Sequence, residues 1–268
     1  MSDAFFTPLS GDGRRYRGEE ACVGPWSPQL MHGGPPSALL VQASEQAAAG
    51  VDDGLIAVRA SVDFLSSVPV GDVEVSARVV RRGRRITLTE ATLATGGKQV
   101  LQARVWHVGP AETATPARDD DRTRQPPAPL QVAVEMTGWT FPYAKALEWR
   151  VVDGDPTGPG AAAVWSRSRI PVVAGREPSG LQRAVLTADS GNGISAGLDW
   201  NRWSFVNIDL DVHLSRPLAG VWVLLDAVTR YEPSGTALAT SALFDEQGPV
   251  GRGAQTLVVS PRGPAVDA

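Results

Sequence analysis

One carboxylate, Asp189, stands at the end of an apolar segment that has the spacing of a helix. It follows Val185 by four residues and Leu181 by eight, so it falls at the edge of the apolar stripe. A carboxylate that is partly withdrawn from water near the negative end of a helix dipole suits a general base. The residues leave a second interpretation open, in which Asp189 begins a polar helix terminus that faces water.

Two glycines, Gly33 and Gly34, come before another helix-like segment, and His32 stands directly before them. Glycines at a helix start let a second molecule approach the free backbone N–H groups, where the helix dipole is positive. Such a site could hold a carbonyl oxygen while it becomes negative. The glycines could instead form a tight turn needed only for packing, and His32 could be a packed or capping residue.

The segments that carry these residues belong to an internal repeat with a period of about half the chain. The segment Asp63–Pro69 recurs as Asp211–Pro217, and each copy has an Asp six residues before a Pro. A helix-like segment precedes each copy, and two strand-like segments around a turn follow it. The repeat predicts a duplicated domain.

The predicted elements have the same order in both halves. The strands alternate apolar and polar residues, which is typical of half-buried antiparallel sheets. Since a three-turn helix followed by such strands is best buried inside a wrapped sheet, we expect an α+β fold. Two units could pair edge to edge into one sheet with both helices on the same side. The predicted helices are 36–49 and 179–190, and the predicted strands are 58–64, 73–79, 86–93, 100–108, 205–214, 222–231, 237–244 and 250–259.

Residues 109–129 differ from the rest of the chain, because they are rich in Pro, Asp, Arg, Thr and Ala and have almost no large apolar residue. Such a segment buries too little surface to offset its ordering entropy and reads as a linker. The expected division is therefore an N-terminal unit at 1–108, a linker at 109–129 and a C-terminal unit at 130–268.

The composition excludes several classes of protein. A net charge of −4 over 268 residues argues against a nucleic-acid binder. The single Cys22 cannot form an internal disulfide, the N-terminus lacks a secretion signal, and no apolar run is long enough to enter a bilayer, so we expect a cytoplasmic protein. His32, His107 and His213 lack metal-ligand spacing, so no metal is expected. The sequence contains no Gly-x-Ser-x-Gly elbow, which argues against a serine hydrolase of the α/β type.

Three patches, in this order and spacing, give the chain a resemblance to a known family. They are 32–40, 188–193 and 207–217, the last with the terminal hairpin 244–255. Over nearly its whole length the sequence resembles the acyl-CoA thioesterase II family, the double-hotdog thioesterases. The resemblance implies two hotdog units, each with an antiparallel sheet wrapped around a central helix.

The resemblance also implies a catalytic set. In that family an Asp on the second helix, a Thr on the following strand and a Gln on the last strand hold the hydrolytic water. By position these are Asp189, Asn207 and Gln255, with Asn in place of Thr. A backbone N–H of Gly33 or Gly34 would polarise the thioester carbonyl, and attack by Asp189 itself, giving an anhydride, stays open. Without the resemblance, Asn207 would read as a strand-end cap and Gln255 as an exposed cross-strand partner.

The implied partner is an acyl-CoA substrate, with no cofactor, a role in lipid metabolism and assembly as a homo-oligomer, either a dimer or a tetramer. The basic turn 81–85 could meet the phosphates of coenzyme A or be merely solvated. Of the tryptophans crowded into the second half, one or two could line an acyl channel. Only one active site is expected. The pseudo-symmetric cleft, lined by Ala47 and 175–177, would lack both a carboxylate and a glycine pair.

Two other functions compete with hydrolysis. One is a non-catalytic acyl or CoA-ligand binding protein on the same fold, favoured if Asn207 means that the water site is lost. The other is a hotdog hydratase or dehydratase, which would use a His with an acid near the helix start. His32 has no Asp or Glu within three residues, so this function ranks last.

Overall fold

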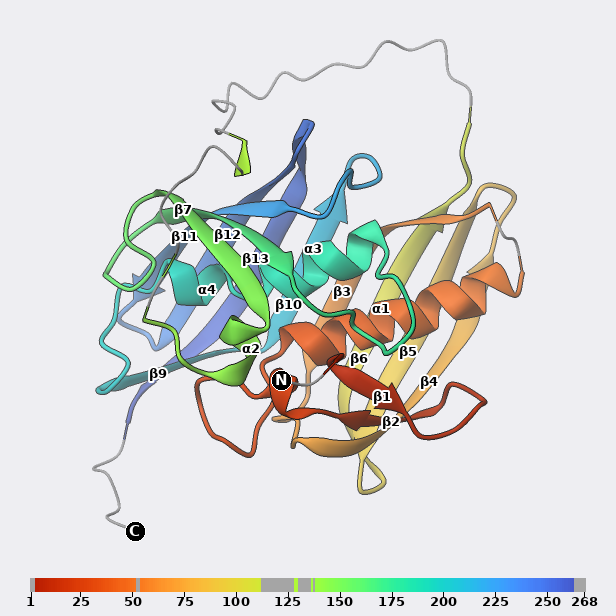
Figure 1. Cartoon of the computed structure of the whole chain (residues 1–268), viewed down its shortest axis with the longest axis horizontal. Coiled ribbons are helices and arrows are strands. Elements are labelled where there is room, and N and C mark those ends of the chain that lie inside the picture. Colours follow the sequence, from red (N-terminus) through yellow and green to blue (C-terminus); the bar gives the residue numbers. More distant parts are fainter. Residues whose placement is uncertain (1–2, 52–53, 112–127, 130–135, 137, 263–268) are drawn as a thin grey trace.

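The computed structural model describes residues 3–51, 54–111, 128–129, 136 and 138–262. In this part of the chain, strands from both halves form one 13-stranded sheet, and the two longest helices lie on the same face of it (Figure 1). None of the described helices combines the length and apolar character needed to cross a bilayer.

The elements of the first half are β1 (Phe6–Pro8), β2 (Arg15–Gly18), η1 (Glu20–Cys22), α1 (Gly34–Ala49), β3 (Ile56–Phe64), β4 (Gly71–Arg82), β5 (Ile86–Thr95) and β6 (Lys98–Val108). Those of the second half are α2 (Pro142–Lys145), β7 (Leu147–Asp153), β8 (Ala162–Ser168), α3 (Gly180–Ala188), α4 (Gly191–Ile194), β9 (Trp203–Asn207), β10 (Asp209–Leu214), β11 (Val223–Glu232), β12 (Thr236–Asp245) and β13 (Gly248–Pro261).

The two halves join edge to edge through antiparallel β3 and β10. The strand order is β1-β2-β4-β5-β6-β3-β10-β13-β12-β11-β8-β7, with β9 pairing β13 beside β10. Val62 faces Leu210 at this seam, and these two residues occupy equivalent positions in the repeat. The register therefore relates the halves by a pseudo-twofold axis, and the predicted α+β fold, with two units paired edge to edge into one sheet, is confirmed.

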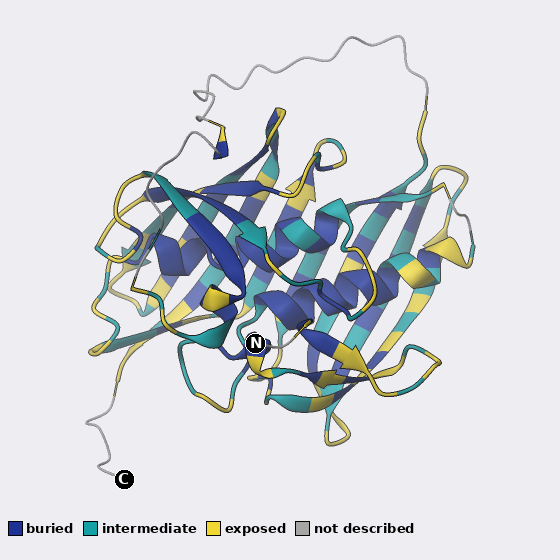
Figure 2. Ribbon diagram, viewed as in Figure 1, coloured by how far each residue is buried: buried dark blue, intermediate teal, exposed yellow. Residues whose placement is uncertain are grey.

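The helix α1 is buried along most of its length (Figure 2). The sheet covers one side of it, and α3 packs against another. It begins two residues before the predicted start, at Gly34, because proline at the first helical positions is already set to helical φ. The shorter α3 is capped by Ser179, whose Oγ accepts the Gln182 N–H at 3.2 Å.

Two features of the sheet differ from the sequence-based prediction. The strands β1, β2, β7 and β8 were not predicted, because they lie outside the repeated pattern from which the others were inferred. The single strand predicted at 205–214 is interrupted at Ile208, so that the pairing to β13 shifts by one residue between β9 and β10. Asp209 fills this irregularity, since its Oδ1 accepts the Thr256 N–H at 2.6 Å.

The linker predicted at 109–129 lies almost entirely outside the described residues. The division of the chain into units at 1–108 and 130–268 therefore stays a prediction.

One buried ion pair ties the repeated segment of the second half to the β12–β13 turn. Arg216 donates two hydrogen bonds to the carboxylate of Asp245, which is 1% exposed. The same carboxylate accepts the N–H groups of Ala219 at 2.7 Å and Gln247 at 2.8 Å. Burial acts to raise the pKa of Asp245, but the hydrogen bonds from Arg216 and the backbone outweigh it, and the pKa is lowered.

We expect Asp245→Asn to lower the free energy of unfolding at neutral pH by about 1–3 kcal/mol, because it leaves hydrogen-bond donors unmatched. A group with a lowered folded pKa stabilises the fold above its unfolded value of 3.8, and this stabilisation is lost as the pH falls through the folded value. Urea unfolding across pH should therefore show the difference from the parent protein shrinking below about pH 4. The exposed Asp63→Asn is the control, and an equal effect of both substitutions at neutral pH would refute the role of Asp245.

Candidate active site

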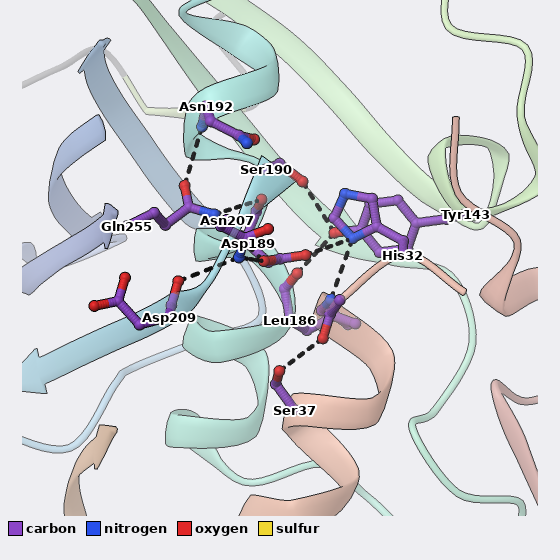
Figure 3. Close-up of polar contacts among 12 residues, drawn as sticks. His32, Ser37, Tyr143, Leu186, Asp189, Ser190, Asn192, Asn207, Asp209 and Gln255 are labelled. Carbon is purple, nitrogen blue, oxygen red and sulfur yellow. Dashed lines mark hydrogen bonds and ion pairs between the residues drawn. The ribbon is translucent and has the colours of Figure 1, made fainter. Parts of the chain in front are cut away.

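The N-terminus of α1 meets the C-terminus of α3 at the junction of the two halves (Figure 3). A methyl group at Gly34 would lie 2.5 Å from the Leu186 carbonyl oxygen, and one at Gly33 would lie 2.8 Å from Asp189 Oδ2. Any side chain at either position would push the helices apart. The packing role considered for these glycines is therefore real, and it brings the helix start onto Asp189.

Asp189 caps the C-terminus of α3 and is 3% exposed. Its Oδ1 accepts hydrogen bonds from Asn207 Nδ2 at 2.9 Å and Gln255 Nε2 at 3.3 Å. Its Oδ2 lies 2.9 Å from Nδ1 of His32. The interpretation in which Asp189 faces water is wrong, since groups from β9, β13 and the segment before α1 surround the carboxylate.

Gln255 holds the turn that follows Asp189. It is 2% exposed, and its Nε2 also donates to the main-chain oxygen of Asp189 at 3.1 Å. Its Oε1 accepts the Asn192 N–H at 3.1 Å, where α4 begins. A methyl group at Gly191 would lie 3.0 Å from that oxygen, so the turn needs a glycine there. Gln255 is thus a buried anchor and not an exposed cross-strand partner.

Asn207 reaches Asp189 from the end of β9, beside the irregularity at Ile208. Its Nδ2 donates to Asp189 and also to the Asp209 carbonyl oxygen at 3.2 Å, so both amide hydrogens are used. Its Oδ1 accepts no hydrogen bond from any residue that the structure describes. Since Asn207 lines a cavity, this oxygen is an acceptor available to a bound molecule.

His32 shares one ring nitrogen between two neighbours. Nδ1 lies 2.9 Å from Asp189 Oδ2, and it also lies 3.2 Å from the Gly34 nitrogen, whose N–H points at it. A ring nitrogen either carries a proton and donates or is bare and accepts. A bare Nδ1 accepts the Gly34 N–H, whereas an Nδ1 that carries a proton donates to Asp189 Oδ2 and cannot accept from Gly34.

Tyr143, which the sequence analysis did not single out, fixes this histidine. The two rings are stacked with centroids 3.8 Å apart and an angle of 8° between their planes. The Tyr143 hydroxyl donates to the Leu186 carbonyl oxygen at 2.7 Å, and it also lies 3.0 Å from Ser190 Oγ. Burial raises the pKa of Tyr143, so the phenol stays neutral. Its only sequence signal is the aromatic run 139–143 after the predicted linker.

A cavity of about 310 Å³ opens onto these groups and is lined by His32, Gly33, Asp189 and Asn207, among others. The Gly33 N–H has no acceptor among the described residues, and the next two helix positions are prolines without an N–H group. Among the described residues, Gly33 therefore supplies the free donor of this helix start, while the Gly34 N–H is directed at His32 Nδ1. No group of three or more His, Cys, Asp or Glu side chains within the described ranges could hold a metal ion.

The cleft related to this one by the pseudo-twofold axis lies at the opposite ends of the same helices, and its lining differs from the lining expected from the sequence. A cavity of about 320 Å³ there is lined by Glu45, Ser179 and His107, and not by Ala47 or 175–177. It has a carboxylate after all, because Ser179 Oγ and Gln182 Nε2 donate to Glu45 at 2.6 and 2.5 Å.

The polar groups of this pseudo-symmetric cleft differ from those around Asp189. Burial lowers the pKa of His107 to about 4, so its ring is neutral near pH 7. The described residues that line this cavity include no Asn or Gln and no glycine pair.

The basic turn 81–85 also lies at that opposite end. Arg82 donates to the Val51 carbonyl oxygen, just beyond the C-terminus of α1. The 16 residues of α1 span about 24 Å, so the turn does not reach the cavity at Asp189 within the chain.

Two similar halves that pair edge to edge into one sheet, with their long helices on the same face, form the double-hotdog fold. Residues 23–108 match the model of the acyl-CoA thioesterase N-terminal domain, and residues 112–259 match that of the acyl-CoA thioesterase C-terminal domain. The chain therefore belongs to the acyl-CoA thioesterase family, which places it among the thioester hydrolases. No curated protein matches the sequence.

Several solved structures share the fold over nearly the whole chain. A conserved protein of unknown function with a hot dog fold from Alicyclobacillus acidocaldarius has a TM-score of 0.73 at 16% identity, covering 98% of each chain. The acyl-CoA thioesterase II TesB2 from Mycobacterium marinum has a TM-score of 0.65 at 16% identity, covering 98% of this chain and 96% of its own. A tesB protein from Mycobacterium avium subs paratuberculosis has a TM-score of 0.66 at 16% identity, covering 96% of each.

We expect Gly34→Ala to destabilise the protein by about 1–3 kcal/mol, because the added methyl group would meet the Leu186 carbonyl oxygen inside the helix contact. Gly50→Ala, at the other end of α1, is the matched control, since its methyl group would lie 3.6 Å from the nearest atom. Thermal unfolding should show a lower midpoint for the first variant only. Two equal midpoints would mean that the helix contact is looser than described.

Proposed function

We propose that the protein hydrolyses acyl-CoA thioesters with a water molecule activated by Asp189. The observation that supports this proposal best is the arrangement around that carboxylate. Three side chains from both halves hold it at the wall of a cavity, and the free Gly33 N–H at a helix start lies beside it. Family membership supports the reaction class, and the geometry supports the role of each group.

In the first step, water attacks the thioester carbonyl carbon while a lone pair of Asp189 takes one of its protons. The carboxylate oxygens accept from three protein donors, and two oxygens offer about four lone-pair sites. One site is therefore left for water. Asn207 Oδ1 can accept the other hydrogen of this water, which aims its oxygen at the carbonyl. Gln255 acts indirectly, because both of its polar atoms are already engaged in holding Asp189 and Asn192.

The Gly33 N–H, at the positive end of the α1 dipole, stabilises the carbonyl oxygen as it becomes negative. The Gly34 N–H lies beside it but is directed at His32 Nδ1, so Gly33 carries this role. In the second step, the carbon–sulfur bond breaks as the tetrahedral centre collapses. The proton held by Asp189 then passes to the sulfur, which leaves as the thiol of coenzyme A, and the acid remains.

The hydrogen bonds of Asn207 bear on the choice between an enzyme that hydrolyses the thioester and a protein that only binds it. The threonine expected from the family pattern would offer one hydroxyl, whereas Asn207 uses two amide hydrogens on Asp189 and Asp209 and keeps a carbonyl oxygen. The acceptor needed by water is therefore preserved, which favours an enzyme over a non-catalytic binding protein.

A hydratase is a second candidate because one specific observation favours it. The sequence offers no acid near His32, but the fold brings Asp189 of the other half within 2.9 Å of its ring. A His–Asp pair at a helix start could move protons during water addition to an enoyl thioester. Incubation with a 2-enoyl-CoA distinguishes the two, because hydration keeps the thioester and hydrolysis releases a free thiol.

Asp189→Asn should lower kcat for thioester hydrolysis by about 10²–10⁴-fold, because the change keeps the size of the side chain and removes the proton acceptor. Free-thiol release from a panel of acyl-CoAs measures this effect. The matched control is Glu45→Gln in the pseudo-symmetric cleft. This variant should turn over at the parent rate. Equal loss in both variants, or full activity of Asp189→Asn with an unchanged melting temperature, would argue against the assignment.

Asn207→Ala should lower kcat by about tenfold or more and change KM little, because it removes an acceptor for water and a donor to Asp189 while leaving the acyl cavity in place. Steady-state kinetics on one acyl-CoA separate the two constants. A rise in KM with kcat unchanged would instead assign Asn207 to substrate binding.

A further inference from the structure

Five aromatic rings form part of the wall of the cavity at Asp189, beside aliphatic side chains such as Leu30, Met31 and Val68. Trp26 comes from the loop before α1, Phe64 from the end of β3, Trp139 and Phe141 from the segment before α2, and Trp200 from the loop after α4. These segments come from both halves of the chain. The rings line the same cavity as His32, Asp189 and Asn207, so an acyl group attached to the reacting carbonyl can contact them.

The rings are held in place by one another. Trp26 and Trp200 have centroids 4.9 Å apart at 33°, and Trp139 and Phe141 have centroids 5.5 Å apart at 35°. Phe205 packs edge-on against both members of the first pair. The wall therefore contains two fixed aromatic pairs, which lose little freedom when a flat group binds.

A glycine lets the two pairs come together. A methyl group at Gly193 of α4 would lie 3.2 Å from Trp139 and 4.0 Å from Trp200. Gly193 therefore sits under the edges of both indoles, and its missing side chain leaves room for them. A cavity of about 150 Å³ holds one benzene molecule, so about 310 Å³ is enough for a ring and a short connection to the carbonyl.

From this wall we infer that the acyl group of the substrate carries an aromatic ring close to the thioester carbonyl. This inference rests on the proposed hydrolysis and adds the substrate class. Aromatic rings gain from offset or edge-on contact with other rings beyond the burial of their area. A linear chain of the same size gains only from burial, and it loses more rotational freedom on entering a fixed site.

The test compares three acyl-CoAs with the same number of acyl carbons: phenylacetyl-CoA, cyclohexylacetyl-CoA and octanoyl-CoA. We expect kcat/KM for phenylacetyl-CoA to exceed each of the others by about threefold to tenfold. A rate for octanoyl-CoA equal to or above that for phenylacetyl-CoA would overturn the inference. Equal rates for the phenyl and cyclohexyl compounds would also overturn it, because ring shape alone would then explain the preference.

Variants separate the wall from the rest of the protein. In Trp200→Leu the ratio of kcat/KM between phenylacetyl-CoA and octanoyl-CoA should fall toward one. Trp106→Leu is the control, because Trp106 lies on β6 beneath Arg81 and lines no part of the cavity. It should leave both the ratio and the rates unchanged. A ratio that survives Trp200→Leu would show that the preference arises elsewhere.

A binding measurement keeps this inference distinct from the proposed function. Ketone analogues, in which a methylene group replaces the thioester sulfur, bind without being hydrolysed. Calorimetry should give a lower Kd for the phenylacetyl analogue than for the octanoyl analogue by the same threefold to tenfold. If none of the three acyl-CoAs is hydrolysed but this difference holds, hydrolysis is wrong and the aromatic site stands. If hydrolysis occurs without the difference, only the aromatic site is wrong.

Discussion

The carboxylate of Asp189 is buried between the two halves of the molecule, and the structure around it depends on keeping that charge satisfied. Burying an ionised group without partners costs far more than any single contact returns. Three side chains meet this demand, from His32 in the first half and from Asn207 and Gln255 in the second. The glycines that allow close helix packing, the interruption between β9 and β10 and the tyrosine beneath His32 all follow from placing these donors.

Duplication supplied two similar clefts, and only one of them carries this arrangement. Both have a carboxylate at the junction of the two helices, Asp189 in one and Glu45 in the other. Ser179 and Gln182, which hold Glu45, belong to the cap and first turn of α3, and the Ser179 hydroxyl already accepts a backbone N–H of that helix start. At Asp189 the helix start has Gly33 and Gly34, and the Gly33 N–H stays available to a bound molecule while the Gly34 N–H is directed at His32.

The sequence alone predicted much of the fold, because the repeat and the period-two alternation are local patterns that survive in each copy. It also brought Asp189, Asn207 and Gln255 together, although only the family resemblance did so for the last two. It led us to expect the glycine pair after His32 and the Asp189 carboxylate in one cleft, but it did not predict the contact between the His32 ring and Asp189, since no local pattern encodes a contact between residues from different halves. Tyr143 and Glu45 were missed for related reasons. Tyr143 acts through stacking that no spacing rule reveals, and Glu45 was missed because the related cleft was expected to be lined by Ala47 instead.

Heavy-oxygen labelling tests most directly whether Asp189 activates water. The enzyme is held in excess over acyl-CoA in oxygen-18 water for one turnover, and mass spectra are then taken of the released acid and of the peptide that contains Asp189. If Asp189 acts as a base, the heavy oxygen enters the acid and the peptide stays unlabelled. Heavy oxygen in the Asp189 carboxylate, with an unlabelled acid, would show that Asp189 attacks the thioester itself and would contradict the account.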